Sequence, residues 1–87
     1  GMTPVKPDTK LHLLPEGSRE VIYAEDQPQY VPLPTIQTPD GKVISAWRLD
    51  PNEIELLKNG APITLMLYTF GAPLQPIVLI VGGVDAR

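Results

Sequence analysis

The sequence predicts an α+β fold: a small, mostly antiparallel β-sheet of four or five strands with one short helix packed on one face. Three observations lead to this prediction. Start, periodicity and stop signals agree on a single helix between Asp50 and Gly60. Seven of the eleven prolines lie in the first 39 residues, which favours extended chain and turns there. Residues 61–84 carry no charge and divide into two pieces of strand length.

Length, cysteine content and charge limit what this chain can be. At 87 residues it is expected to form one domain that buries about 60 to 65 per cent of its unfolded surface. We expect residues 1–9 to be a flexible N-terminal arm and residues 10–87 to be the domain. The absence of cysteine excludes a disulfide framework and a thiolate zinc site. A net charge of -3 with scattered basic residues argues against nucleic acid as a partner.

Strand and turn signals alternate through the proline-rich half of the chain. Residues 10–14 and 19–24 are expected to be short strands joined by a turn at residues 15–18. Residues 30–34 alternate proline with apolar side chains, which is typical of an edge segment or a polyproline II arm.

A hairpin is expected around the Thr-Pro-Asp-Gly sequence at residues 38–41, which suits a type I turn. It would join residues 35–38 to residues 42–47. Trp47 comes just before the helix cap, and we expect it in the core because aromatic rings dominate small cores. An exposed contact site made by Trp47 and Arg48 is the alternative.

The helix is expected to span residues 51–58. Asp50 serves as the N-cap, Pro51 takes the first helical position and Glu53 completes a capping box. Gly60 supplies the stop signal. Because isolated helices shorter than about 12 to 15 residues are marginal in water, this helix must pack on another element. The uncharged run that follows it is the expected support.

The uncharged run could be a membrane span or a buried hairpin. Its length permits a span, but prolines and glycines divide it into residues 63–70 and 77–81, both rich in β-branched or aromatic side chains. We therefore predict two strands joined by a loop at residues 71–76, with no membrane insertion.

Both predicted strands are apolar on both faces, and one short helix cannot cover two faces. Either the proline-rich half or another copy of the chain must cover the second face, because soluble monomers rarely expose large apolar patches. We predict a homo-oligomer, most simply a two-fold dimer. Its interface is expected to contain Met66, Tyr68, Phe70, Val78 and Ile80.

No group of residues has the pattern of a catalytic, metal or cofactor site. His12 is the only histidine and lacks clustered ligands, so we expect a surface or strand-face residue. Ser18 and Ser45 have no nucleophile-elbow context. Glu53 is explained by capping, and the glycine pair at residues 82–83 is interpreted as a turn at the end of a strand rather than a phosphate loop.

The second half of the chain contains a Trp-Arg-Leu sequence at 47–49, the helix positions Glu53, Leu56 and Gly60, and the Leu-Tyr-Thr-Phe-Gly and Pro-Leu-Gln-Pro-Ile sequences at 67–71 and 73–77. With these motifs, residues 42–81 resemble a group of small proteins of unknown function encoded by phages and prophages. The resemblance implies a mobile-element setting and carries over no catalytic residues.

These observations predict a non-enzymatic, self-associating accessory or structural protein of phage type, with no cofactor. The alternative is a peptide-binding or regulatory adaptor that uses the same apolar face and a sheet edge. No signal sequence is evident at the start of the chain, so a cytoplasmic location is expected.

Overall fold

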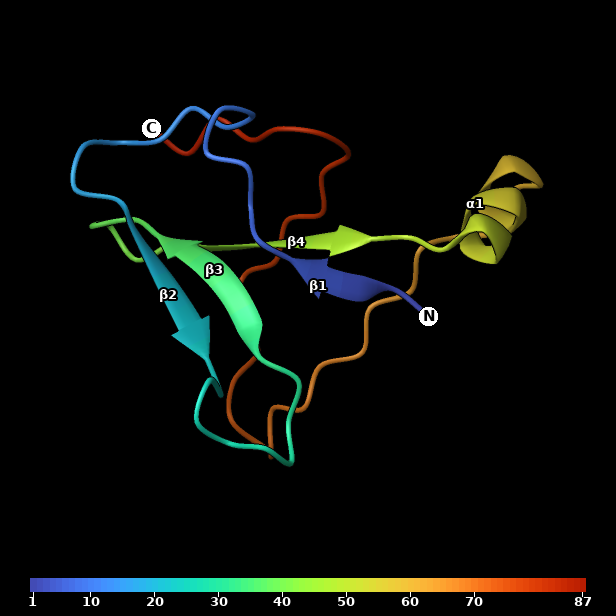
Figure 1. Cartoon of the computed structure of the whole chain (residues 1–87), viewed down its shortest axis with the longest axis horizontal. Helices are drawn as coiled ribbons and strands as arrows, with labels where there is room; N and C mark the ends of the chain where they lie inside the picture. The colour runs from blue at the N-terminus through green and yellow to red at the C-terminus, as the bar shows by residue number, and fades with distance from the viewer.

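The computed structural model describes all 87 residues and confirms the α+β class. Four strands form an antiparallel sheet in the order β1-β4-β3-β2, and one helix follows the last strand (Figure 1). The elements in chain order are β1 (Thr3–Val5), β2 (Arg19–Tyr23), β3 (Leu33–Gln37), β4 (Val43–Arg48) and α1 (Pro51–Lys58).

The N-terminal segment belongs to the sheet, so the prediction of a flexible arm over residues 1–9 is wrong. β1 pairs with residues 46–48 of β4, and Pro4 lies opposite Trp47. Proline is tolerated there because β1 is an edge strand whose outer side needs no donor. Residues 10–14 do not form the predicted strand and contribute only a bridge between Leu13 and Asp85.

The β2–β3 ladder runs the full length of both strands, from Arg19 opposite Gln37 to Tyr23 opposite Leu33. The β3–β4 ladder is shorter and ends where Thr35 meets Ser45. The residue of β3 directly before Thr35 is Pro34, which has no N–H to donate, so the β3–β4 ladder ends beside it.

The turn predicted at residues 38–41 is confirmed. Thr38 donates its N–H to the Lys42 carbonyl over 2.9 Å, and Gly41 donates to the Thr38 carbonyl over 3.1 Å. Gly41 has φ +93°, a left-handed conformation that glycine adopts without a steric penalty. The Lys42 side chain donates to Asp40 and holds the pKa of that carboxyl below its usual range.

The helix has the bounds and the capping box that its sequence predicts. The Asp50 carboxylate accepts the Glu53 N–H over 2.7 Å, and the Asp50 N–H donates to the Glu53 carboxylate over 2.9 Å. Accepting that N–H lowers the pKa of Asp50. At the other end, Gly60 has φ +90° and the Ala61 N–H donates to the Leu56 carbonyl over 3.0 Å.

The helix projects beyond the end of β4 and packs against no strand, so its predicted position on a sheet face is wrong (Figure 1). Only two residues separate it from β4, and the run expected to support it does not form a sheet. Ile54 and Leu56 are consequently exposed. A small apolar hollow of about 110 Å³ lies between the helix and the residues before and after it, including Met2, Leu49 and Ile63.

The core is small for a chain of this length. The buried hydrophobic side chains are Ile36 and Ala86, and the threonines Thr35 and Thr38 are also buried. Trp47 is 48% exposed and donates its indole N–H to the Ser45 hydroxyl over 2.9 Å, so its predicted core position is wrong. The strand that pairs with this end of β4 is β1, which has only three residues and is too short to enclose an indole.

Candidate interaction site

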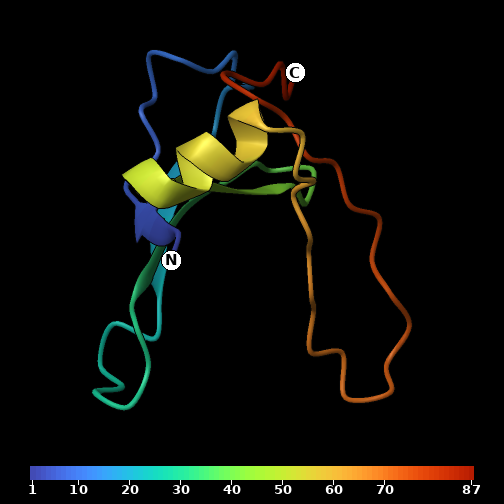
Figure 2. The same cartoon turned by 90° about the vertical axis from the view of Figure 1, so that its right-hand side faces the viewer.

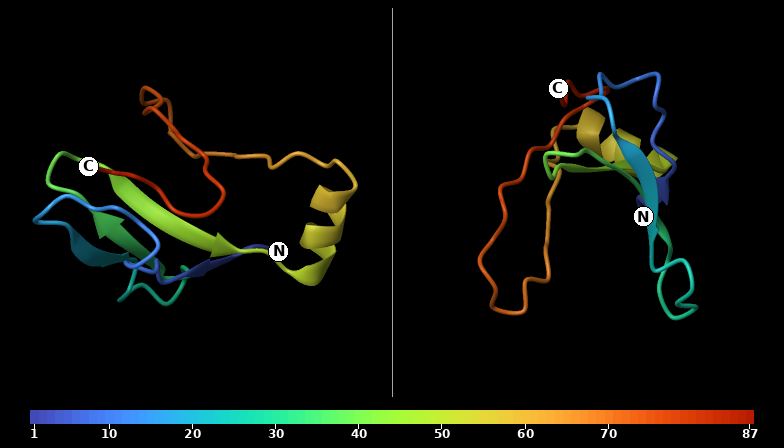
Figure 3. Two further views of the ribbon diagram at one scale, coloured as in Figure 1. Left: turned by 90° about the horizontal axis from the view of Figure 1, so that it is seen from above. Right: turned by 90° about the vertical axis from the view of Figure 1, so that its left-hand side faces the viewer.

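The most unusual feature of the fold is the excursion at residues 62–83, which we call the apolar loop. It leaves the end of the helix, extends away from the body and returns toward the C-terminus, with its two legs well apart (Figure 2). The views in Figure 3 show it standing off from one side of the sheet. The strands predicted at residues 63–70 and 77–81 are therefore absent from the single chain.

The backbone of the apolar loop is almost free of internal hydrogen bonds. Between residues 62 and 83 there is one, in which the Ala72 N–H donates to the Thr69 carbonyl over 2.9 Å. Extended chain whose N–H and C=O groups point to solvent is a template for pairing with another strand.

That one hydrogen bond closes a tight turn at the tip. Its two central residues, Phe70 and Gly71, have φ +52° and +83°, the signs that a type I′ hairpin turn requires. The prediction of a longer loop at residues 71–76 is thus wrong. Phenylalanine is disfavoured at positive φ by about 1 to 2 kcal/mol, which is why the sequence does not indicate a turn here.

Proline in the returning leg limits how many residues of the two legs can pair with each other from this turn. A two-residue turn at 70–71 would place Leu74 opposite Leu67 and Pro76 opposite Leu65 in hydrogen-bonded positions. Pro76 has no N–H, so the ladder would break at that pair. The legs therefore separate a few residues from the tip.

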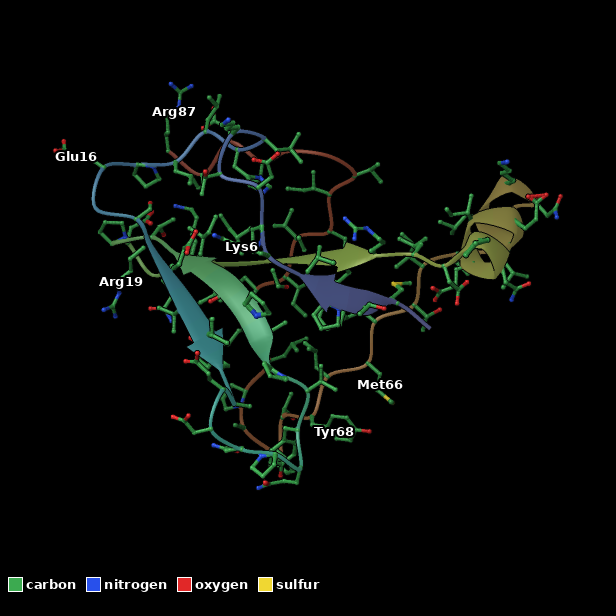
Figure 4. All side chains as sticks on the ribbon, viewed as in Figure 1. Lys6, Glu16, Arg19, Met66, Tyr68 and Arg87 are labelled. Atoms are coloured by element: carbon green, nitrogen blue, oxygen red, sulfur yellow. The ribbon has the colours of Figure 1, made fainter.

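All five residues predicted for an interface lie on the apolar loop and are exposed: Met66, Tyr68, Phe70, Val78 and Ile80. Met66 and Tyr68 point away from the body (Figure 4). The Tyr68 and Phe70 rings stack with centroids 6.4 Å apart. Val81, which is 94% exposed, is not among the predicted interface residues.

The returning leg is fastened to the N-terminal half by contacts that we call the clamp. His12 Nδ1 accepts the Val84 N–H over 3.1 Å, Leu13 donates to the Val84 carbonyl over 2.9 Å, and Ala86 donates to the Leu13 carbonyl over 2.8 Å. Gly83 lies so close to this segment that a Cβ there would be 2.0 Å from the Leu11 carbonyl oxygen. Glycine is required at this position.

The clamp accounts for His12 and for the glycine pair at residues 82–83. His12 Nδ1 acts as an acceptor, while Nε2 is buried without a hydrogen-bond partner. The two glycines play separate parts, since Gly82 has φ +91° and Gly83 makes the close approach.

Other polar side chains of the chain also have structural partners. Ser18 donates its hydroxyl to the Pro15 carbonyl over 2.7 Å within the predicted turn. Glu53 is engaged in the capping box. Arg87 donates to Asp85 over 3.1 Å, and these bonds hold the pKa of Asp85 below its usual range. No three His, Cys, Asp or Glu side chains gather where they could hold a metal ion.

The chain has no helix of the length and apolar character needed to cross a membrane. Comparisons with models of protein families, with curated proteins and with solved structures found no match.

Proposed function

We propose that this chain is a non-enzymatic, self-associating structural or accessory protein of the kind encoded by phages and prophages. The observation that carries the proposal is the exposure of the apolar loop. Twelve of its large hydrophobic side chains are exposed: Ile63, Leu65, Met66, Leu67, Tyr68, Phe70, Leu74, Ile77, Val78, Leu79, Ile80 and Val81. Monomeric soluble proteins rarely expose a contiguous apolar patch of more than a few hundred Å².

The free energy available from covering this loop is large enough to support association. Each large apolar side chain contributes about 1.5 to 3 kcal/mol when it is fully buried. Burying half of the twelve would contribute about 9 to 18 kcal/mol per copy. Association costs about 4 to 15 kcal/mol in lost freedom of motion, so even partial burial from both copies offsets it.

The body of the chain supplies a second reason to associate. A domain of this size is marginal even when its core is well filled, and here only two hydrophobic side chains are buried. Covering the apolar loop with another copy would provide the apolar burial that the single chain lacks. Proteins with such a small folded core often acquire their stability from oligomerisation.

The non-enzymatic part of the proposal rests on the partners of the polar groups. His12, Ser18 and Glu53 each make a hydrogen bond to the backbone, in the clamp, a turn and a helix cap. A hollow beside the helix contains one titratable side chain, Glu53, and a hollow near the tip of the apolar loop also contains one, Tyr68.

The first prediction tests self-association with one substitution and a matched control. Val78 lies on the apolar loop and is 78% exposed, whereas Val31 lies between β2 and β3 and is 72% exposed. Light scattering at about 100 μM, well above the Kd expected for a standard-sized interface, should find an oligomer for the native chain. Val78→Lys should lower the molar mass toward that of one chain, because it would bury an unpaired charge.

Val31→Lys introduces the same charge on a valine outside the loop and should leave the oligomer intact. A native chain that scatters as a monomer at this concentration would refute the proposal. Equal effects of the two substitutions would also count against it, because they would indicate a response to net charge alone.

A peptide-binding adaptor is the second candidate, and the open backbone of the apolar loop favours it specifically. A peptide strand from another protein could pair with either leg as readily as a second copy could. The oligomeric state separates the two functions, because apolar side chains that are already covered by another copy are not available to a peptide.

A further inference from the structure

We propose that residues 77–81 of one copy pair antiparallel with the same residues of a second copy, as a β-ladder whose two-fold axis passes at Leu79. This proposal rests on the proposed self-association and specifies how the copies join. It adds main-chain pairing of one defined segment to the apolar burial argued above.

The outer strands of the sheet differ from the legs of the apolar loop in how open their edges are to another strand. Strand edges that carry charges, proline or very few residues resist pairing with other chains. β2 presents Arg19 and Glu20, with Lys6 3.4 Å from the Glu20 carboxylate, and Arg19 points outward from the sheet (Figure 4). β1, at the other edge, is three residues long and has proline at its centre. Both outer strands of the sheet are therefore protected, whereas the legs of the apolar loop are not.

The returning leg of the apolar loop contains the segment that is best suited to pair with another chain. If the two legs paired with each other from the turn at 70–71, Ile77 would lie opposite Thr64 and Val78 opposite Ile63. These two pairs would lie between the break in the ladder at Pro76 and the next proline, Pro62. Too few pairs remain there to hold a ladder within one chain. Residues 77–81 contain no proline, all five are exposed, and four of the five are β-branched, so they are suited to a strand but lack a partner in their own chain.

A second copy of the chain is the partner that best matches the uncharged returning leg. No charged residue occurs between Ala61 and Val84, so a partner with charges on its pairing edge would lose their hydration without compensation. A second copy brings an uncharged strand of equal length. Around a two-fold axis at Leu79, Ile77 faces Val81 and Val78 faces Ile80, which places large apolar side chains opposite each other on both faces of the ladder.

Cysteine substitution tests the register directly, because the native chain has no cysteine. In the proposed ladder, Leu79 faces its own image with Cα atoms about 4.5 to 5.5 Å apart, within the range of a disulfide. Ile77 lies four residues along the partner strand from its image, about 13 Å away, which is too far for a disulfide.

Under mild oxidation, the full-length Leu79→Cys protein should form a disulfide-linked dimer, while the Ile77→Cys and Val81→Cys proteins should not. An equimolar mixture of the Ile77→Cys and Val81→Cys proteins should form the mixed dimer. Hydrogen exchange of the native protein should show slowed amides at residues 77–81 in the oligomer, and these amides should speed up on dilution to the monomer.

Three results would overturn the inference. Equal cross-linking of all three single-cysteine proteins would indicate a parallel ladder or random collision. An oligomer by light scattering without cross-linking at Leu79 would refute the strand pairing but leave self-association standing. A native chain that remains a monomer at about 100 μM would remove both proposals, since a standard-sized interface is populated at that concentration.

Discussion

Replacing Gly83 with alanine should open the clamp at the base of the apolar loop. An added Cβ would lie 2.0 Å from the Leu11 carbonyl oxygen and 3.0 Å from the Leu11 carbonyl carbon. These are backbone atoms and cannot rotate away as a side chain would, so the Leu11 backbone must shift. The residues that follow it, His12 and Leu13, supply the clamp contacts to Val84 and Ala86.

The size of the effect follows from the bonds that the shift would break. The clamp contains three hydrogen bonds of 2.8 to 3.1 Å, and each contributes about 0.5 to 1.5 kcal/mol to net stability. Gly83→Ala should therefore lower the free energy of unfolding by about 1.5 to 4.5 kcal/mol. With a urea slope of about 1 to 2 kcal/mol per M for a small protein, the midpoint should fall by about 0.8 to 4.5 M.

Gly82→Ala is the matched control for this measurement. Gly82 has φ +91°, and a methyl group added there would meet nothing within 4 Å, so alanine costs only about 1 to 2 kcal/mol of backbone strain. Both variants should be unfolded in urea at one protein concentration, with hydrogen exchange of the Leu13 and Ala86 amides followed in parallel. If Gly83→Ala leaves the exchange of these two amides unchanged, the reasoning about the clamp is refuted.

Two further predictions concern the turns and their charges. Replacing Phe70, at φ +52°, with asparagine should preserve the tip turn because asparagine tolerates left-handed geometry, whereas valine should break it; exchange of the Ala72 amide, slow in the first variant and fast in the second, is the measurement. The lowered pKa of Asp40 means that its contribution to stability is present above its unfolded pKa of about 3.9 and is lost as the pH falls through the folded value. Urea midpoints measured from pH 5 to pH 3 should therefore fall less for Asp40→Asn than for the native chain. An equal fall of the midpoint in both proteins would contradict this role of Asp40.

Features whose causes lie within a few residues could be predicted from the sequence. The helix cap depends on Asp50 and Glu53, three positions apart, and the β3–β4 turn depends on residues 38–42. Both form as the sequence predicts, because each side chain finds its backbone partner locally. The exposure of Met66, Tyr68 and Val78 is also predictable in part, since one short helix cannot cover two apolar faces.

Features that depend on distant residues could not be predicted. β1 pairs with a strand more than 40 positions away, and the clamp joins His12 to Val84 across 72 positions. The sequence of a short apolar segment does not indicate whether its own chain supplies a strand to pair with it. For this reason, the prediction that residues 63–70 and 77–81 form an intramolecular hairpin is wrong. The tip turn could not be predicted for another reason: phenylalanine disfavours the left-handed conformation that Phe70 adopts there.

The clamp also determines how two copies could come together. The apolar loop is held at one end by the helix and at the other by the Val84 hydrogen bonds, so both of its ends are anchored. A loop that is anchored at both ends cannot thread through another chain and can only approach it from the side. Joining two copies in this way requires neither copy to unfold, in contrast to the exchange of a terminal segment. The rate of assembly should then be set by diffusion and orientation of the folded chains, and dilution should reverse it without a slow refolding step.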